Sequence, residues 1–337
     1  MSVVPRPVAA HTPMAFVQAV LQAYAERGRD PSGALLKAQI TPPNLANPDL
    51  RVGAGAFERL CAAAMQELDD EALGWFSRRL PWGSYGLLAR ASTGAPTLGV
   101  ALARWCRHHG LLTDDVRLTL AVARGVATLS IEERRLPPAL REFALLSLLR
   151  NAHGLACWWI DSRIPLAEAV FPFAAPAHAD AYARMFPGPT RFGAARAALR
   201  FDAGYLQLPL RRDDAALDLM LRRALALMVL PYRHDRLLVE RVRQLLASGG
   251  AHTAESVAAQ LAVSARTLHR ALRAEGASLQ VLKDEARRAR ATELLLRTRR
   301  PVKQVAHEAG FRSDKAFIRA FRAWTGHTPD ELRRQAE

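Results

Sequence analysis

The sequence predicts two domains: an α+β domain of about residues 1–230, then an all-α domain of about residues 235–337 with two helix-turn-helix units joined by a long helix. Three observations predict this organisation. One helix-turn-helix pattern occurs twice in about the last hundred residues. Strand-like alternation of apolar and polar residues is confined to the part before residue 203. The length of 337 residues is enough for two domains with substantial cores.

In the first domain, apolar residues at helical spacing predict helices that Gly or Pro residues end. A stripe from Phe16 to Tyr24 precedes Gly28, and a break at Thr41-Pro42-Pro43 leads into another helix. Further helices are predicted over residues 57–68, 98–109, 138–160, 178–185 and 217–230, the second of them ending at Gly110. The helix over 138–160 is long and apolar.

Strands are predicted where apolar residues alternate or β-formers cluster. Val116–Leu120 and Val126–Ile131 alternate on either side of Gly125, which predicts a hairpin. Short strand-like pieces follow at Ala169–Phe173, Arg191–Gly193 and Leu199–Asp202. Helices and strands together make the first domain α+β.

The second domain is predicted to be helical throughout. A helix over 234–247 stops at Ser248-Gly249-Gly250, and Thr253 is placed to cap the next helix. Ser264 and Ser313 are predicted N-caps of two further helices, which end at Gly276 and before Gly326. Between them, a helix over 279–297 spans roughly 28 Å at 1.5 Å per residue. A capping box from Thr328 to Glu331 begins the last helix.

The repeat is an internal duplication. Moving 48 positions along the chain relates Ala258 to Ala306 and Ala262 to Gly310, and moving 49 relates Leu268 to Phe317, because Arg312 is an extra residue in the second turn. Small residues recur where two helices must cross closely. Large apolar residues recur on the buried face, and basic residues recur on the outer face of the second helix. This pattern is typical of a helix that lies in the major groove of DNA.

The charge is consistent with an anionic partner. The formal net charge is +15, and the chain from Pro231 onward carries most of it, chiefly as Arg. Arg suits bidentate contacts to phosphate and guanine. By itself the charge is equally explained by a solvated basic surface.

Nothing in the sequence indicates catalysis, a cofactor or a metal. Cys61, Cys106 and Cys157 are scattered without metal-finger spacing, which favours a reducing compartment and no disulfides. The Cys106-x-His108-His109 group lacks a second ligand pair, so ordinary histidines at a helix end explain it better. No Gly-rich phosphate loop or G-x-S-x-G motif is present. The N-terminus lacks a leader pattern and no apolar run reaches about 18 residues, so we expect a cytoplasmic protein without membrane contact.

The second domain resembles the DNA-binding domain of the AraC/XylS family of bacterial transcription regulators. The run over 309–329, AGFRSDKAFIRAFRAWTGHTP, carries the resemblance together with Ser264-x-Arg266-Thr267-Leu268-x-Arg270. The resemblance implies two helix-turn-helix units that place recognition helices in successive major-groove segments of promoter DNA, and contact with RNA polymerase. The family usually has a small and then an acidic residue after Gly-Phe, whereas this chain has Arg312-Ser313-Asp314, which puts the base preference of the second unit in doubt.

The predicted DNA contacts lie on the two recognition helices, at their N-caps and on the connecting helix. We expect contacts to bases from Arg266, His269, Arg270, Asp314, Lys315 and Arg319. We expect contacts to phosphates from Ser264, Thr267, Arg273, Arg287, Arg288, Ser313 and Arg322. A solvated basic face is the alternative for both helices, and Asp314 would then only stabilise the start of its helix. For Arg287 and Arg288 the alternative is pairing with Asp284 or Glu293 within one helix.

The first domain resembles the sensor-type domain, often labelled arabinose-binding, of ornithine-utilisation and quorum-related AraC regulators. The resemblance rests on residues 92–98 (STGAPTL), 171–178 (FPFAAPAH), 191–202 (RFGAARAALRFD) and 208–210 (LPL). The helical start does not resemble the β-barrel sugar-binding arm of the arabinose regulator, so arabinose is not carried over. The resemblance implies that this domain senses a small molecule or dimerises.

An apolar pocket with a charged anchor is predicted in this domain. The helix over 143–160 and the Phe171–Phe173 strand would line it, with the candidate residues Trp158, Trp159, Phe171, Phe173, Arg191 and Arg196. This composition predicts an amphipathic effector with an acyl or aromatic body and an anionic head. The alternative is that the apolar residues fill the core and that both arginines are at the surface.

These observations predict a one-component transcription factor, most simply a ligand-responsive activator. The alternative is a ligand-independent repressor or architectural protein whose first domain only forms a homodimer. A third possibility is an enzyme with a DNA-binding appendage, which no motif supports.

Overall fold

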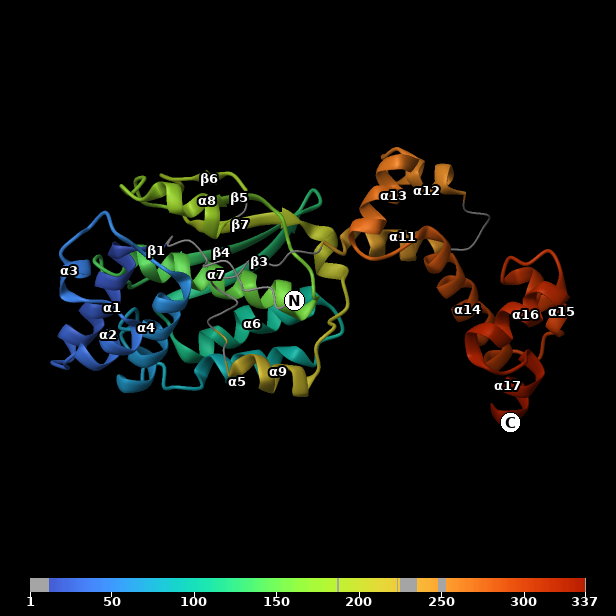
Figure 1. Ribbon diagram of the computed structural model, residues 1–337, viewed down its shortest axis with the longest axis horizontal. Helices are drawn as coiled ribbons and strands as arrows, with labels where there is room; N and C mark the ends of the chain where they lie inside the picture. The colour runs from blue at the N-terminus through green and yellow to red at the C-terminus, as the bar shows by residue number, and fades with distance from the viewer. Residues whose placement is uncertain (1–11, 187, 223, 225–234, 248–252, 337) are drawn as a thin grey trace, which may run out of the picture. The chain divides into compact units, whose positions relative to one another are not determined.

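The computed structural model describes residues 12–186, 188–222, 224, 235–247 and 253–336. The chain divides into two compact units, Met1–Arg233 and His234–Glu337. The first unit is α+β and the second is helical, as the sequence predicts (Figure 1).

The first unit is organised on a five-stranded sheet with strand order β3-β4-β7-β5-β6. All neighbouring strands are antiparallel except β5 and β6. The strands are β3 (Val116–Ala123), β4 (Val126–Glu133), β5 (Leu166–Val170), β6 (Thr190–Arg191) and β7 (Ala197–Asp202). A separate two-stranded ribbon pairs β1 (Thr12–Pro13) with β2 (Arg51–Val52).

The predicted hairpin is confirmed. Strands β3 and β4 pair along their whole length, from Val116 opposite Glu133 to Ala123 opposite Val126. The two turn residues, Arg124 and Gly125, have φ of 50° and 76°. Two left-handed residues are what a two-residue hairpin turn requires, because that turn matches the twist of the strands.

Helices cover the sheet in layers. Helices α6 and α7 pack against strands of the sheet, and α5 packs on α6 with α9 beyond it (Figure 1). Helix α7 is almost wholly buried, which accounts for its apolar sequence. The helices of this unit are α1 (Met14–Glu26), α2 (Ser32–Ala38), α3 (Pro42–Leu45), α4 (Ala54–Glu67), α5 (Ser84–Thr93), α6 (Leu98–Leu112), α7 (Arg141–Trp159), α8 (Tyr182–Met185) and α9 (Asp214–Leu221).

Several element boundaries differ from the sequence prediction. Helix α5 was not predicted, because its Gly, Ser and Thr content gives a low helix propensity that packing on α6 overrides. Helix α6 continues through Gly110 to Leu112, and β5 and β7 begin earlier than predicted. The predicted helix over 178–185 begins as a 3-10 turn at Ala179–Ala181. The end of the helix predicted over 217–230 lies outside the described residues.

The second unit contains two small cores that share one long helix. The first lies among α11, α12, α13 and the start of α14, and the second among the end of α14, α15 and α16. Leu279 and Leu282 of α14 belong to the first core, and Leu294 and Leu295 belong to the second. The helices are α11 (Leu237–Ala247), α12 (Ala254–Gln260), α13 (Ala265–Ala274), α14 (Leu279–Arg297), α15 (Val302–Glu308), α16 (Asp314–Thr325) and α17 (Pro329–Ala336).

The duplicated turn has the same backbone geometry in both helix-turn-helix units. Ala262 has φ of 54° and Gly310 has φ of 80°. The next residue donates its N–H back into the preceding helix, Val263 to the Ala258 carbonyl and Phe311 to the Ala306 carbonyl, each at 2.9 Å. This is a Schellman ending. The close helix crossing predicted for this position is wrong at Gly310, because a Cβ there would meet only the Arg287 side chain, at 3.8 Å.

We predict opposite effects at these two equivalent positions. Gly310→Ala should lower the free energy of unfolding by about 1 kcal/mol, because an L-residue is strained at this φ. Ala262→Gly should raise it by up to about 1 kcal/mol by relieving the same strain. Urea denaturation of each variant measures both values, and changes of the same sign would contradict this explanation.

We also predict that residues 235–337 fold alone and bind DNA as a monomer. Both cores of this unit consist of residues between Val239 and Phe321, and one chain already carries both recognition helices. Circular dichroism of the fragment tests whether it folds. Analytical ultracentrifugation of the fragment with a promoter duplex tests how many copies bind. An unfolded fragment, or binding that requires two fragments, would show that the first unit is needed.

Candidate nucleic-acid interface

Helix α13 is held so that one face is buried and the other exposed. The Ser264 side chain caps the helix by accepting from the Thr267 N–H at 3.1 Å. Leu268 and Leu272 are fully buried in the first core. The three predicted base-contacting residues lie off this stripe and are exposed: Arg266, His269 and Arg270.

Helix α16 repeats this arrangement with aromatic anchors. Ser313 caps it by accepting from the Ala316 N–H at 3.5 Å, and Phe317 and Phe321 are fully buried. The three predicted base-contacting residues of this helix are again exposed: Asp314, Lys315 and Arg319. Asp314 also accepts from the Lys315 N–H at 2.9 Å, so it stabilises the first turn as well.

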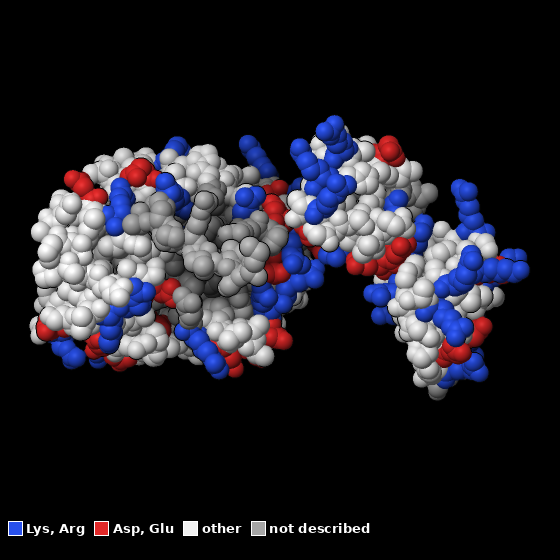
Figure 2. All heavy atoms as spheres, in the orientation of Figure 1, with Lys and Arg blue, Asp and Glu red and all other residues white. Residues whose placement is uncertain are grey.

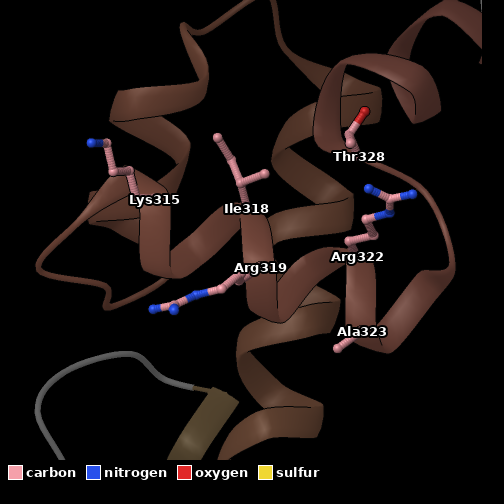
Figure 3. A pocket seen from close by; sticks show the side chains of 6 residues that line it. All are labelled: Lys315, Ile318, Arg319, Arg322, Ala323 and Thr328. Carbon is pink, nitrogen blue, oxygen red and sulfur yellow. The ribbon is translucent and has the colours of Figure 1, made fainter.

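A groove runs along the exposed side of α16 (Figure 3). Lys315, Ile318 and Arg322 follow one another along the helix, and Thr328 comes from the turn before α17. The sequence analysis missed Ile318 and Thr328. Ile318 is 37% exposed and lies off the buried stripe, which is the signal that could have identified it. Apolar side chains in such a position can contact the thymine methyl group.

The predicted phosphate-contacting residues divide into exposed and engaged ones. Arg273, Arg288 and Arg322 are exposed. Arg287 pairs with Asp284 of the same helix at 3.7 Å, which is the alternative to a phosphate contact. Its guanidinium also lies over the Phe311 ring at 5.3 Å. The Thr267 and Ser264 hydroxyl oxygens lie 2.9 Å apart within the cap. Figure 2 shows Lys and Arg side chains projecting from both helix-turn-helix units on the side in view.

The sensor residues predicted from the sequence lie in two separate places. Trp159 is fully buried, donates from Nε1 to the Thr93 hydroxyl at 3.1 Å and packs edge-on to Trp105. Trp158 lies under the Arg212 guanidinium at 5.6 Å. Both tryptophans therefore already have packing partners.

Phe171 lies in a different aromatic cluster, with Phe173, Tyr182 and Phe192 around it at centroid distances of 5.0–6.1 Å. Arg191 pairs with Glu168 at 2.9 Å, and Arg196 is exposed. The structure does not bring these residues together with Trp158 and Trp159. Helix α7 instead contributes Leu148 and Asn151 to a small cavity that residues of α5 and α6 also line.

Family models match both units. Residues 28–210 match the arabinose-binding domain of AraC transcription regulators, and residues 257–335 match a helix-turn-helix domain. The first match alone covers more than half of the chain. The protein belongs to the AraC family of transcription regulators.

Relatives of this AraC-family regulator extend over its whole length. It is 28% identical to the ornithine utilization regulator of Pseudomonas aeruginosa, over 95% of this chain and 96% of that protein. It is 30% identical to the transcriptional regulator VirS of Mycobacterium tuberculosis, over 91% and 92% of the two chains. The solved structure of the regulator CdpR from Pseudomonas aeruginosa is 20% identical, covers 95% of this chain and 98% of its own, and gives a TM-score of 0.33.

The AraC-family regulator is thus a helix-turn-helix transcriptional regulator that binds DNA through its second unit, with a ligand-binding-type domain before it. Among the described helices, none is both long and apolar enough to cross a bilayer. Within the same residues, no three His, Cys, Asp or Glu side chains gather as metal ligands.

We predict different losses for two arginines. Arg270→Ala should cost about 1–3 kcal/mol on the specific site and relax the preference at one base pair, because a bidentate contact to guanine is lost. Arg322→Ala should weaken all sequences alike and lower the salt slope by about one unit. Anisotropy titrations on specific and random duplexes at several salt concentrations measure both effects.

Arg297→Ala is the matched control, because Arg297 lies on the connecting helix, is 79% exposed and pairs with Glu293. This variant should change neither affinity nor salt slope. An equal loss on specific and random DNA for Arg270→Ala would contradict the base contact.

Proposed function

We propose that this protein is a cytoplasmic one-component activator that binds promoter DNA through α13 and α16 and responds to a small effector bound by its first unit. The observation that carries the DNA-binding proposal is the repeated arrangement of the two helices. Each is capped by a serine, anchored by two buried side chains and exposes at least two basic residues on its outer face.

The contacts to bases and phosphates are proposed for the residues that the structure leaves exposed on these helices. Because one chain supplies both recognition helices, it can cover two successive major-groove segments without a partner. Contact with RNA polymerase is proposed from the family resemblance, and activation is proposed from that contact. A homodimer would add avidity but is not required for recognition.

Ligand response is proposed from the class of the first domain and from the sensor-type resemblance. The competing function is a repressor or architectural protein whose first unit only forms a dimer. The two differ in whether a small molecule changes DNA affinity or transcription.

The test is a genome-wide footprint of the bound protein, followed by transcription with purified RNA polymerase from the promoters found. We expect a small set of sites, and transcript levels that rise several-fold when the regulator is added. A matched variant with Arg266, Arg270, Lys315 and Arg319 changed to Ala should lose the footprints while keeping its fold. Unchanged footprints in that variant would refute the DNA-contact proposal, and reduced transcription would favour the repressor.

A further inference from the structure

The first unit contains a cavity of about 50 Å³ that no sequence motif marks. Its wall is built from the segment before α5 and from helices α5, α6 and α7, which lie up to 80 residues apart in the chain. The acidic, aromatic and histidine side chains that line it are Glu71, Trp75, Phe76, Tyr85, Trp105 and His109. A cavity of this size holds roughly three or four water-sized groups.

Three of these side chains have an enclosed polar atom with no hydrogen-bond partner among the described residues. The atoms are Nε1 of Trp75, the hydroxyl oxygen of Tyr85 and Nδ1 of His109. Trp75 and His109 are themselves 6% and 4% exposed. Buried polar atoms in folded proteins almost always have partners, so three unpartnered ones around one cavity indicate an occupant with polar groups.

The electrostatics of the cavity favour a cation. Glu71 is held in the wall, since its two carboxylate oxygens accept from the Gly83 N–H at 2.8 Å and the Tyr85 N–H at 2.6 Å. Burial raises the pKa of Glu71, the N–H groups of Tyr85 and Gly83 oppose this rise, and the negative charges of Asp70 and Asp69 add to it. A bound cation would offset the repulsion between these carboxylates. Among the described residues, no Lys or Arg lines the cavity. Burial lowers the pKa of His109 to about 4, so the ring is neutral at pH 7 and can accept a hydrogen bond.

Aromatic rings complete the wall. Tyr85 and Trp105 lie edge to face with centroids 5.4 Å apart, and Trp75 and Phe76 lie edge to face at 6.3 Å. The faces of aromatic rings attract cations, so aromatic side chains in a cavity wall suit an ammonium group. The Trp75 N–H can only donate, so an occupant that satisfies it must also carry an acceptor.

We propose that this cavity is the effector site of the regulator and binds a small primary amine that carries one acceptor oxygen, an inference that rests on the proposed ligand response. The ammonium group finds acceptors in Glu71, Tyr85 and His109, and the oxygen accepts from Trp75. The anionic head predicted from the sequence has no cationic partner among the described residues that line this cavity.

The cavity is connected to the end of the unit through α5. Tyr85 and Leu88 of this helix line the cavity, while Gly86 packs against Leu221 of α9 and Arg90 pairs with Asp218 at 2.5 Å. Helix α9 precedes the DNA-binding unit in the chain. Occupancy that holds α5 in place therefore also supports α9.

Calorimetric titration of the full-length protein with four matched probes tests the proposal. Ethanolamine carries both groups, ethylammonium lacks the acceptor, ethylene glycol lacks the charge and glycolate reverses it. We expect saturable binding of ethanolamine and a rise in Tm, weaker binding of ethylammonium, and no binding of the other two. The proposal is overturned if ethanolamine does not bind, or if glycolate or ethylene glycol binds as well as it does.

Two tyrosine variants give a matched comparison. Tyr85→Phe should weaken ethanolamine binding by about tenfold or more and leave the Tm of the free protein unchanged, because the hydroxyl it removes has no partner. Tyr24→Phe removes a hydroxyl that donates to Glu67 at 2.7 Å, so it should lower the Tm but leave ethanolamine affinity unchanged. Wild-type affinity in Tyr85→Phe would refute the site.

The failure of this site can be told apart from the failure of the proposed function. DNA binding is measured by anisotropy without any probe, and amine binding is measured without DNA. Loss of amine binding with intact DNA binding removes only the effector site. Intact amine binding without an effect on DNA affinity or transcription would show that the cavity is not the effector site.

Discussion

Two pairs of buried side chains, Leu268 with Leu272 and Phe317 with Phe321, determine the DNA-binding face of this regulator. Each pair fixes the rotation of its helix about its own axis, because both members must enter a small core. The basic side chains lie on the other faces of each helix and therefore point outward. The long helix α14 supplies apolar residues to both cores. Neither helix-turn-helix unit can therefore rotate about α14 without exposing apolar side chains.

The two recognition helices share this frame but differ in chemistry. The proposed base contacts of α13 are two arginines and a histidine, whereas those of α16 are a carboxylate, a lysine and an arginine beside the exposed Ile318. Cytosine N4 can donate to a carboxylate and the thymine methyl group can contact an isoleucine. The duplication therefore repeats the fold with different side chains on the outer face.

In the first unit, aromatic side chains have two distinct roles. The rings around Phe171 pack on one another and stabilise the end of the sheet. The rings around Tyr85 and Trp105 instead border a cavity whose polar atoms lack partners among the described residues. Trp159 lies directly behind Trp105 and holds it through an edge contact, so the sequence-predicted tryptophan supports the cavity wall without lining it.

The sequence by itself determined what local periodicity and capping control. The stripes of α13 and α16, the serine caps, the capping box at Thr328 and the hairpin at Gly125 are all encoded within a few residues. Tertiary structure decided the rest. Helix α5 is stabilised by packing on α6, and Gly310 suits a left-handed turn rather than a helix crossing. The cavity brings Glu71, Tyr85 and His109 together from separate elements, and only packing decides which space between buried side chains stays unfilled.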